Sequence, residues 1–92
     1  MIIQELTLRQ FRNHSYLKVN FEKGINAIVG SNGIGKTNIV EAIYFLSYGR
    51  SFRTENEIDM IQDNQDFASI EGVFKNEDDE IKKIKVVITR SG

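Results

Sequence analysis

Eight consecutive residues of this chain, 30–37 (GSNGIGKT), match the phosphate-binding pattern G-x-x-x-x-G-K-[ST] over its whole length. The three glycines allow a tight backbone whose N–H groups can approach phosphate oxygens. Lys36 supplies a mobile charge for the β- and γ-phosphates and is the predicted catalytic residue, while Thr37 offers a hydroxyl to Mg²⁺. The predicted cofactors are therefore ATP and Mg²⁺, bound by Gly30, Ser31, Asn32, Gly33, Ile34, Gly35, Lys36, Thr37 and the following Asn38.

The segments on either side of this loop have the character that the motif requires. An apolar run over 25–29 predicts a buried strand that enters the loop, and residues 36–48 predict a helix that leaves it. The first turn of a helix favours an anion, because its backbone N–H groups are unpaired and its dipole is positive there. The helix is apolar on several sides, so we expect it to be packed on most of them, and Gly49 is the expected stop.

Alternating apolar residues predict further strands over 2–9, 15–21, 68–74 and 84–88. The acidic run 76–80 between the last two predicts a solvated turn, and residues 55–61 predict a short helix. Lysines 82, 83 and 85 fit a solvated strand edge. The expected fold class is α/β, an α+β mixed sheet of mostly antiparallel strands with one central phosphate-loop helix.

Length and composition limit the chain to one small soluble domain. It has 92 residues, 40% hydrophobic and 27% charged, with no cysteine and no apolar run long enough for a membrane span. These features, and the lack of a signal-peptide pattern, predict a cytoplasmic protein with no membrane partner. Residues 1–53 hold seven Lys/Arg against three Asp/Glu, whereas residues 54–92 hold five against ten. The positive half contains the phosphate loop, which suits a polyanionic ligand, although uneven solvated charge explains it equally well.

The acidic residue that completes a phosphoryl-transfer site is missing from this sequence. Such a Walker B acid follows a buried apolar strand and holds Mg²⁺, but the final strand leads into Thr89-Arg90-Ser91-Gly92. The chain therefore has the sequence expected of the front end of a larger nucleotide-binding domain, with its catalytic acids absent.

Three segments resemble the N-terminus of the RecF family, bacterial recombinational-repair ATPases of the ABC/SMC/Rad50 class. They are residues 8–13 (LRQFRN), 28–38 (IVGSNGIGKTN) and 41–53 (EAIYFLSYGRSFR). The Phe-Arg pair and the phosphate loop are shared with SMC and Rad50 proteins, whereas GRSFR after the helix is more particular to RecF. The match extends well over residues 1–62 and loosely over the last hairpin.

The resemblance implies that residues 1–92 are the incomplete N-terminal part of an ABC/SMC-like ATPase head. The full-length family member is implied to be a weak ATPase that dimerises around ATP and binds single-stranded DNA and gapped or junction duplexes. It is also implied to work with RecO and RecR in replication-fork repair and the SOS response, near the nucleoid. The fragment alone is expected to be inactive.

The resemblance adds Arg12 and Asn13 to the predicted site, and the residues themselves suggest roles for Arg50, Arg53 and Glu41. Arg12 is expected to reach a phosphate and Asn13 to line the nucleotide site; the alternative is an exposed turn. Arg50 and Arg53, on either side of Phe52, could hold DNA phosphates, or could be surface residues and intramolecular partners while the ring packs. Glu41 is expected to be structural, complementing the helix dipole.

Two rival functions stay open at this point. The chain could belong to an SMC- or Rad50-like head, which a downstream coiled coil would distinguish. It could also be a non-catalytic nucleotide- or DNA-binding module, which a gel-shift assay with and without ATP would separate from the ATPases.

Overall fold

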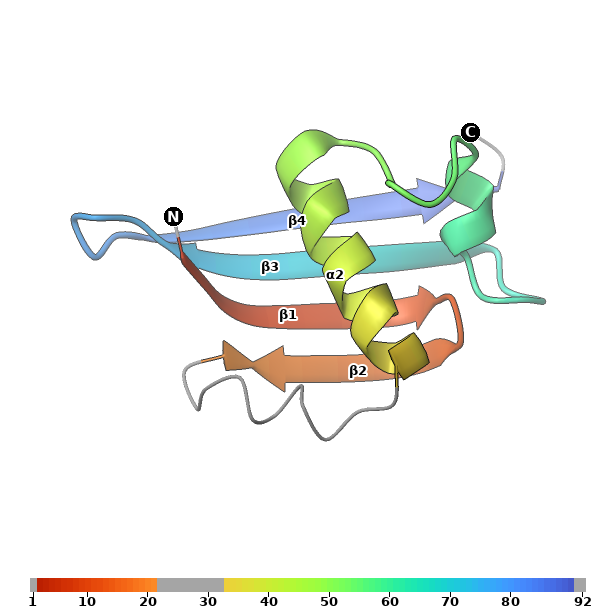
Figure 1. The fold of residues 1–92 in the computed structure, drawn as a ribbon, viewed down its shortest axis with the longest axis horizontal. Coiled ribbons are helices and arrows are strands. Elements are labelled where there is room, and N and C mark those ends of the chain that lie inside the picture. Colours follow the sequence, from red (N-terminus) through yellow and green to blue (C-terminus); the bar gives the residue numbers. More distant parts are fainter. Residues whose placement is uncertain (1, 22–32, 91–92) are drawn as a thin grey trace.

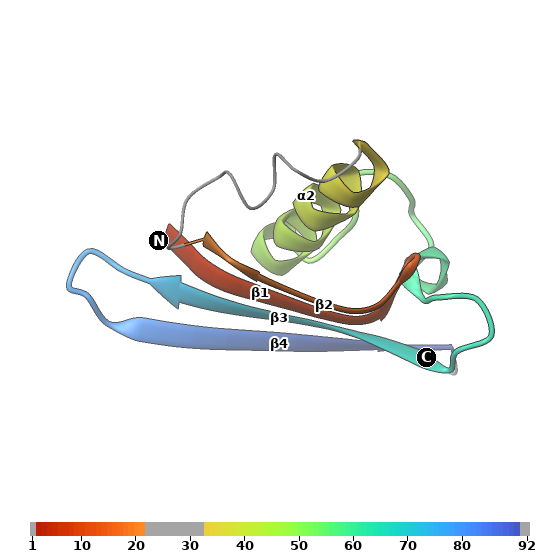
Figure 2. The same cartoon turned by 90° about the horizontal axis from the view of Figure 1, so that it is seen from below.

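A computed structural model describes residues 2–21 and 33–90, which form a four-stranded antiparallel sheet with one long helix across one face (Figures 1 and 2). The strand order is β2-β1-β3-β4. In chain order the elements are β1 (Ile2–Phe11), β2 (His14–Asn20), α2 (Gly33–Tyr48), the 3₁₀ helix η2 (Glu57–Met60), β3 (Phe67–Lys75) and β4 (Ile81–Thr89).

Two hairpins make the sheet, and β1 joins them by pairing with both β2 and β3. At the centre, Leu8 lies opposite Leu17 on one side and Ile70 on the other. The strands predicted over 2–9, 15–21, 68–74 and 84–88 are confirmed within one or two residues at most ends. The pairing of β1 with β3 was not predicted, because alternation identifies a strand but not its neighbour.

The core lies between the sheet and α2. Alternate residues of β1 and β3 point towards the helix, which presents Ile39, Ala42 and Phe45 in return. This layer of helix on sheet buries the apolar face of each element. The buried cluster consists of Leu6, Leu8, Phe11, Val19, Ile39, Ala42, Phe45, Met60, Ile61, Ala68, Ile70 and Ile88.

Helix α2 begins three residues before the predicted start, at Gly33, and ends as predicted at Tyr48. Gly49 has a φ of 75° and donates its N–H to the Phe45 carbonyl at 2.8 Å, the left-handed cap expected of glycine. The expectation of packing on most sides is wrong for the part of the chain that the structure describes, because Val40 is 49% exposed and Tyr48 68% exposed. Among the described residues, the buried side chains of the helix, such as Ile39, Ala42 and Phe45, belong to the core cluster that it forms with the sheet.

Several predictions fall on residues outside this description. They are the strand over 25–29 and the loop residues Gly30, Ser31 and Asn32. The mixed sheet therefore stays a prediction, and the sheet formed by the four described strands is purely antiparallel. Within residues 2–21 and 33–90, no helix is long and apolar enough to cross a membrane.

Candidate functional site

The turn between β1 and β2 places Arg12 and Asn13 at one end of the sheet. Gln10 and Arg12 have φ values of 54° and 53°, a left-handed conformation that is unfavourable for these residue types. The end of η2 and the residues after it hold this turn in place, because the Arg12 N–H donates to the Met60 carbonyl and the Gln62 N–H donates to the Gln10 carbonyl, both at 2.8 Å. The backbone of Arg12 is therefore fixed from outside its own hairpin.

A carboxylate on α2 receives the Arg12 side chain. Glu41 has no exposed surface, and its two oxygens accept from Arg12 Nε at 2.9 Å and Arg12 Nη2 at 2.7 Å. Ser51 Oγ donates to Glu41 Oε2 at 2.6 Å, and Arg53 Nη1 donates to Oε1 at 3.1 Å. One buried carboxylate thus holds together the helix, the β1–β2 turn and the loop after the helix.

The charge of Glu41 is maintained by these partners. Burial raises the pKa of this carboxyl, since a charged group loses hydration when it leaves water. Hydrogen bonds from Arg12 and Ser51, with the positive charges of Arg12 and Arg53, more than offset burial, so the pKa lies below its ordinary value of 4.5. The carboxylate is therefore ionised at neutral pH.

Two amide side chains extend this cluster towards the start of α2. Asn38 is 2% exposed and donates from Nδ2 to Asn13 Oδ1 at 2.7 Å. Arg53 Nη1 donates to Asn38 Oδ1, also at 2.7 Å. Because oxygen and nitrogen of Asn38 each have a partner, the side chain is held in one orientation.

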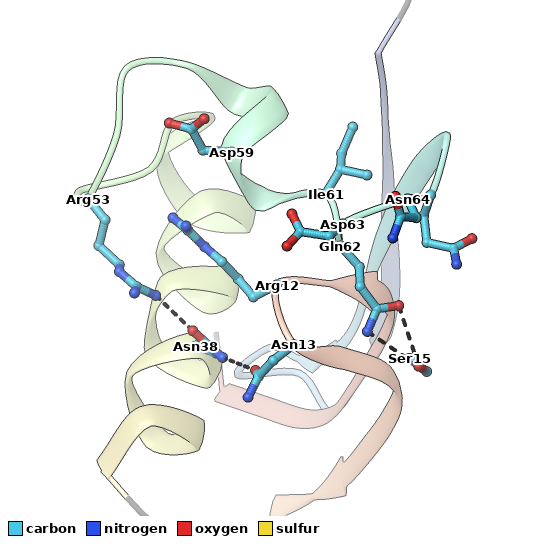
Figure 3. Close-up of a pocket in the computed structure, with 11 residues that line it drawn as sticks. Arg12, Asn13, Ser15, Asn38, Arg53, Asp59, Ile61, Gln62, Asp63 and Asn64 are labelled. Atoms are coloured by element: carbon cyan, nitrogen blue, oxygen red, sulfur yellow. Dashed lines mark hydrogen bonds between the residues drawn. The ribbon is translucent and has the colours of Figure 1, made fainter.

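A polar pocket of about 770 Å³ opens beside this cluster, in the size range of small-molecule sites (Figure 3). In Figure 3, Arg12 extends from the β1–β2 turn towards α2, and Arg53 reaches Asn38 from the loop after the helix. Amide, acidic and basic groups converge there on a common volume. The lining residues are Arg12, Asn13, Ser15, Asn38, Arg53, Asp59, Ile61, Gln62, Asp63, Asn64 and Gln65.

The structure brings together four of the residues singled out from the sequence: Arg12, Asn13, Asn38 and Arg53. Lys36 and Thr37 are exposed at the beginning of α2, directly before Asn38 in the chain. Nothing in the structure tests the ligand contacts predicted for any of these residues, so those contacts stay predictions.

Arg50 lies in a second pocket, of about 640 Å³, along the loop after α2, which Arg53 also lines. Phe52 lies beside it and is 48% exposed, with its ring against Tyr44 in an edge-on contact at 5.3 Å. Phe52 is therefore half-packed. Arg53 has the intramolecular partners that the alternative interpretation expected, and the DNA contacts of Arg50 and Arg53 stay predictions.

Sequence reasoning missed Glu41 as the centre of the cluster and Ser51 as its partner. The dipole explanation for Glu41 is wrong, because α2 begins at Gly33 and has no acidic residue in its first turn. The sequence does place these residues on one helix face, because Asn38, Glu41, Ala42 and Phe45 follow the spacing i, i+3, i+4, i+7. Two polar residues on a buried stripe indicate partners from elsewhere in the fold.

Comparison with known proteins places this fold and site in a defined class. The sequence pattern of the RecF/RecN/SMC N-terminal domain matches residues 2–92. The chain therefore belongs to the RecF/RecN/SMC N-terminal domain family.

Within this family the similarity is to RecF proteins, as the three segments predicted. The chain is 45% identical to the DNA replication and repair protein RecF of Halalkalibacterium halodurans over 92 residues, covering 100% of this chain and 24% of that protein. It is 40% identical to RecF of Bacillus subtilis, again over its whole length and 25% of the relative. The chain thus spans about a quarter of the length of these relatives.

A solved structure agrees with the sequence comparison. The recombination mediator protein RecF-ATP of the RecFOR pathway superposes with a TM-score of 0.80 at 26% identity, covering 99% of this chain and 24% of that one. A second RecF structure, with ATPrS, superposes with a TM-score of 0.81 at 28% identity. The antiparallel sheet with α2 across one face, as the described residues form it, is therefore the arrangement of the RecF N-terminal region.

Proposed function

We propose that this chain is the ATP-binding N-terminal part of a RecF-type DNA replication and repair ATPase. The observation that carries the proposal is the complete phosphate-loop motif running into α2, whose first residue, Gly33, is the second glycine of that motif. Backbone N–H groups at a helix start bind phosphate readily. The RecF proteins with ATP and ATPrS, similar over nearly the whole chain, support ATP as the nucleotide.

The described residues fit such a ligand. Lys36 would contact the β- and γ-phosphates, and Thr37 would hold Mg²⁺. Asn38 lines the 770 Å³ pocket with Arg12 and Asn13 and is the direct neighbour of Thr37 in the chain, although Lys36 and Thr37 do not line the pocket themselves. Among the residues that the structure describes, no group of three or more His, Asp or Glu could hold a metal ion alone. Mg²⁺ is therefore proposed to arrive with the nucleotide phosphates.

The activities of the whole protein are part of the same proposal, because this chain spans only about a quarter of its relatives. We propose slow ATP hydrolysis, ATP-dependent homodimerisation and binding of single-strand/duplex DNA junctions. RecO and RecR are the proposed protein partners, in a bacterial cytoplasm near the nucleoid. The 92-residue chain alone is proposed to be inactive, since it lacks a Walker B acid.

Calorimetric titration with Mg²⁺-ATP, and then with GTP, tests the nucleotide proposal. Wild type should bind ATP, and Lys36→Ala should weaken binding roughly 10- to 150-fold, because it removes a charge-assisted contact of about 1.5–3 kcal/mol. Lys18→Ala, a partly exposed lysine on β2, is the matched control. Equal affinity of wild type and Lys36→Ala for ATP would refute the assignment.

A gel-shift assay with gapped duplex DNA tests the proposed DNA contact. Arg50→Ala should weaken binding with ATP present, and the effect should shrink at high salt, as expected for a phosphate contact. Arg9→Ala removes an arginine that lies over the Tyr16 ring on β1–β2 and is the control. If binding is the same with and without ATP, the chain acts instead as a module without nucleotide control.

A further inference from the structure

The buried carboxylate of Glu41 holds Arg12 by one edge of its guanidinium. The two hydrogen bonds from Arg12 to this carboxylate use Nε and Nη2, and a guanidinium carries five N–H donors in a fixed plane. Within residues 2–21 and 33–90, the remaining donors of Arg12 are not taken by Glu41, and Arg12 lines the pocket. Such a side-on pair sets the plane of the guanidinium as well as its position.

The same carboxylate constrains a second arginine. Arg53 Nη1 is shared between Glu41 Oε1 at 3.1 Å and Asn38 Oδ1 at 2.7 Å. Glu41 thus contacts both arginines among the described residues that line the pocket, and Asn38 is bonded in turn to Asn13. Nothing in the phosphate-loop motif itself requires an acid at this position.

We propose that Glu41 is a positioning residue for the nucleotide site, fixing the guanidinium of Arg12, and through Arg53 the amide of Asn38, in the orientation that receives the ligand. This inference rests on the proposed ATP binding. It assigns Glu41 no contact with the nucleotide, since its side chain has no exposed surface and both oxygens are occupied.

The net charge of the cluster alone predicts that replacing Glu41 strengthens ATP binding, whereas the proposal predicts weaker binding. The direction of the change in affinity therefore tests the proposal. Glu41, Arg12 and Arg53 together carry one net positive charge, and replacing Glu41 by glutamine raises it to two. Added positive charge attracts a polyanion more strongly. If orientation matters more than charge, the same substitution weakens ATP binding instead.

A purely structural role is the other alternative. Glu41 could join α2 to the turn and the following loop without influencing the ligand. Removing it would then lower the stability of the fold, while the folded protein would bind ATP with unchanged affinity. A comparison of affinity in folded samples separates the two roles.

The experiment is a double-mutant cycle, measured by titration calorimetry with Mg²⁺-ATP in the longest natural form of the protein. Glu41→Gln should weaken ATP binding roughly 10-fold, the lower end of the roughly 10- to 100-fold loss seen when a residue that orients a metal ligand is replaced. Arg12→Ala should weaken it by 10-fold or more. The double variant should bind more weakly than Arg12→Ala, but by less than the full effect of Glu41→Gln, because only the route through Arg53 to Asn38 is then left to lose. Glu77→Gln, on the exposed β3–β4 turn, is the control.

Three results overturn the proposal: equal or tighter binding by Glu41→Gln, additive effects in the double variant, or an effect as large in Glu77→Gln. If Glu41→Gln does not fold, Glu41→Asp replaces it in the same cycle. Aspartate keeps the negative charge, but its side chain is one methylene shorter, so the carboxylate lies farther from Arg12. Wild-type affinity in Glu41→Asp would then overturn the proposal. Failure of wild type to bind ATP would instead refute the proposed function, a separate outcome.

Discussion

The β3–β4 hairpin and the cluster around Glu41 show two ways in which this sequence determines structure. In the hairpin, nine consecutive residue pairs from Phe67–Thr89 to Lys75–Ile81 are joined by one short turn. In the cluster, the Arg12–Glu41 bonds join residues 29 positions apart, and the Asn38–Asn13 bond joins residues 25 apart. The hairpin is determined by a local alternation of residue types, whereas the cluster forms only when the fold brings distant segments together.

The two regions also differ in what their ion pairs contribute. The hairpin has an exposed pair, Lys83–Glu71, with the lysine side chain 64% exposed. The cluster has Arg12–Glu41, with the glutamate side chain fully buried. Surface pairs contribute little because water and salt screen them, whereas breaking a buried pair leaves a group without hydration or a partner.

The largest expected effect on stability comes from breaking the cluster. Glu41→Ala should lower the free energy of unfolding by about 3 kcal/mol, the lower end of the range for breaking a buried pair. The lower end applies because the side chains of Arg12 and Arg53 are 21% and 33% exposed and water can reach them. Urea denaturation followed by circular dichroism measures the change, with Glu77→Ala as control. A loss below about 1 kcal/mol would mean that the cluster is no more important than a surface pair.

Acid should remove part of the same stabilisation. The pKa of Glu41 in the folded protein is below its ordinary value of 4.5, so its contribution is complete above that value and is lost as the pH falls through the folded pKa. The stability difference between wild type and Glu41→Gln should therefore be constant from pH 7 to about 5 and shrink at lower pH. Urea denaturation at a series of pH values tests this. A difference that grows in acid would contradict the sign.

The sequence predicts the hairpin almost completely and the cluster only in part. Alternation predicts β3 and β4, and the acidic run predicts the turn, where Asn76 Oδ1 accepts from the N–H groups of Asp78 and Glu80. Family resemblance points to Arg12 and Asn13, and the arginines on either side of Phe52 point to Arg53. No local rule predicts that Arg12 and Arg53 meet at Glu41 or that Asn13 meets Asn38, because the β1–β3 pairing and the course of the loop after α2 decide it. The one indication in the sequence is that Asn38 and Glu41 are polar residues on the otherwise apolar face of α2, and such residues need partners when buried.

A smaller effect is expected where the helix meets the hairpin. A Cβ atom added to Gly72 would lie 2.7 Å from Leu46 Cδ1 and 2.8 Å from the Phe74 ring. Gly72→Ala should therefore cost about 1–2 kcal/mol, as overpacking usually does, partly relieved by movement of the Leu46 side chain. Thermal unfolding measures it. The double variant with Leu46→Ala should recover part of the loss expected from adding the two single effects; simple additivity would show that the contact is not the cause.

The smallest effect is expected at the exposed pair, and it tests the comparison most directly. Lys83→Ala should change the free energy of unfolding by less than about 0.5 kcal/mol, because exposed pairs rarely contribute more. Glu71 also lies directly opposite Lys85 in the strand register, so that lysine can replace the lost partner. Urea denaturation at low and high salt should give the same small difference within error. If Lys83→Ala instead destabilised the protein as much as Glu41→Ala, burial would not be what separates the two regions, and the central role of Glu41 in the cluster would lose its physical basis.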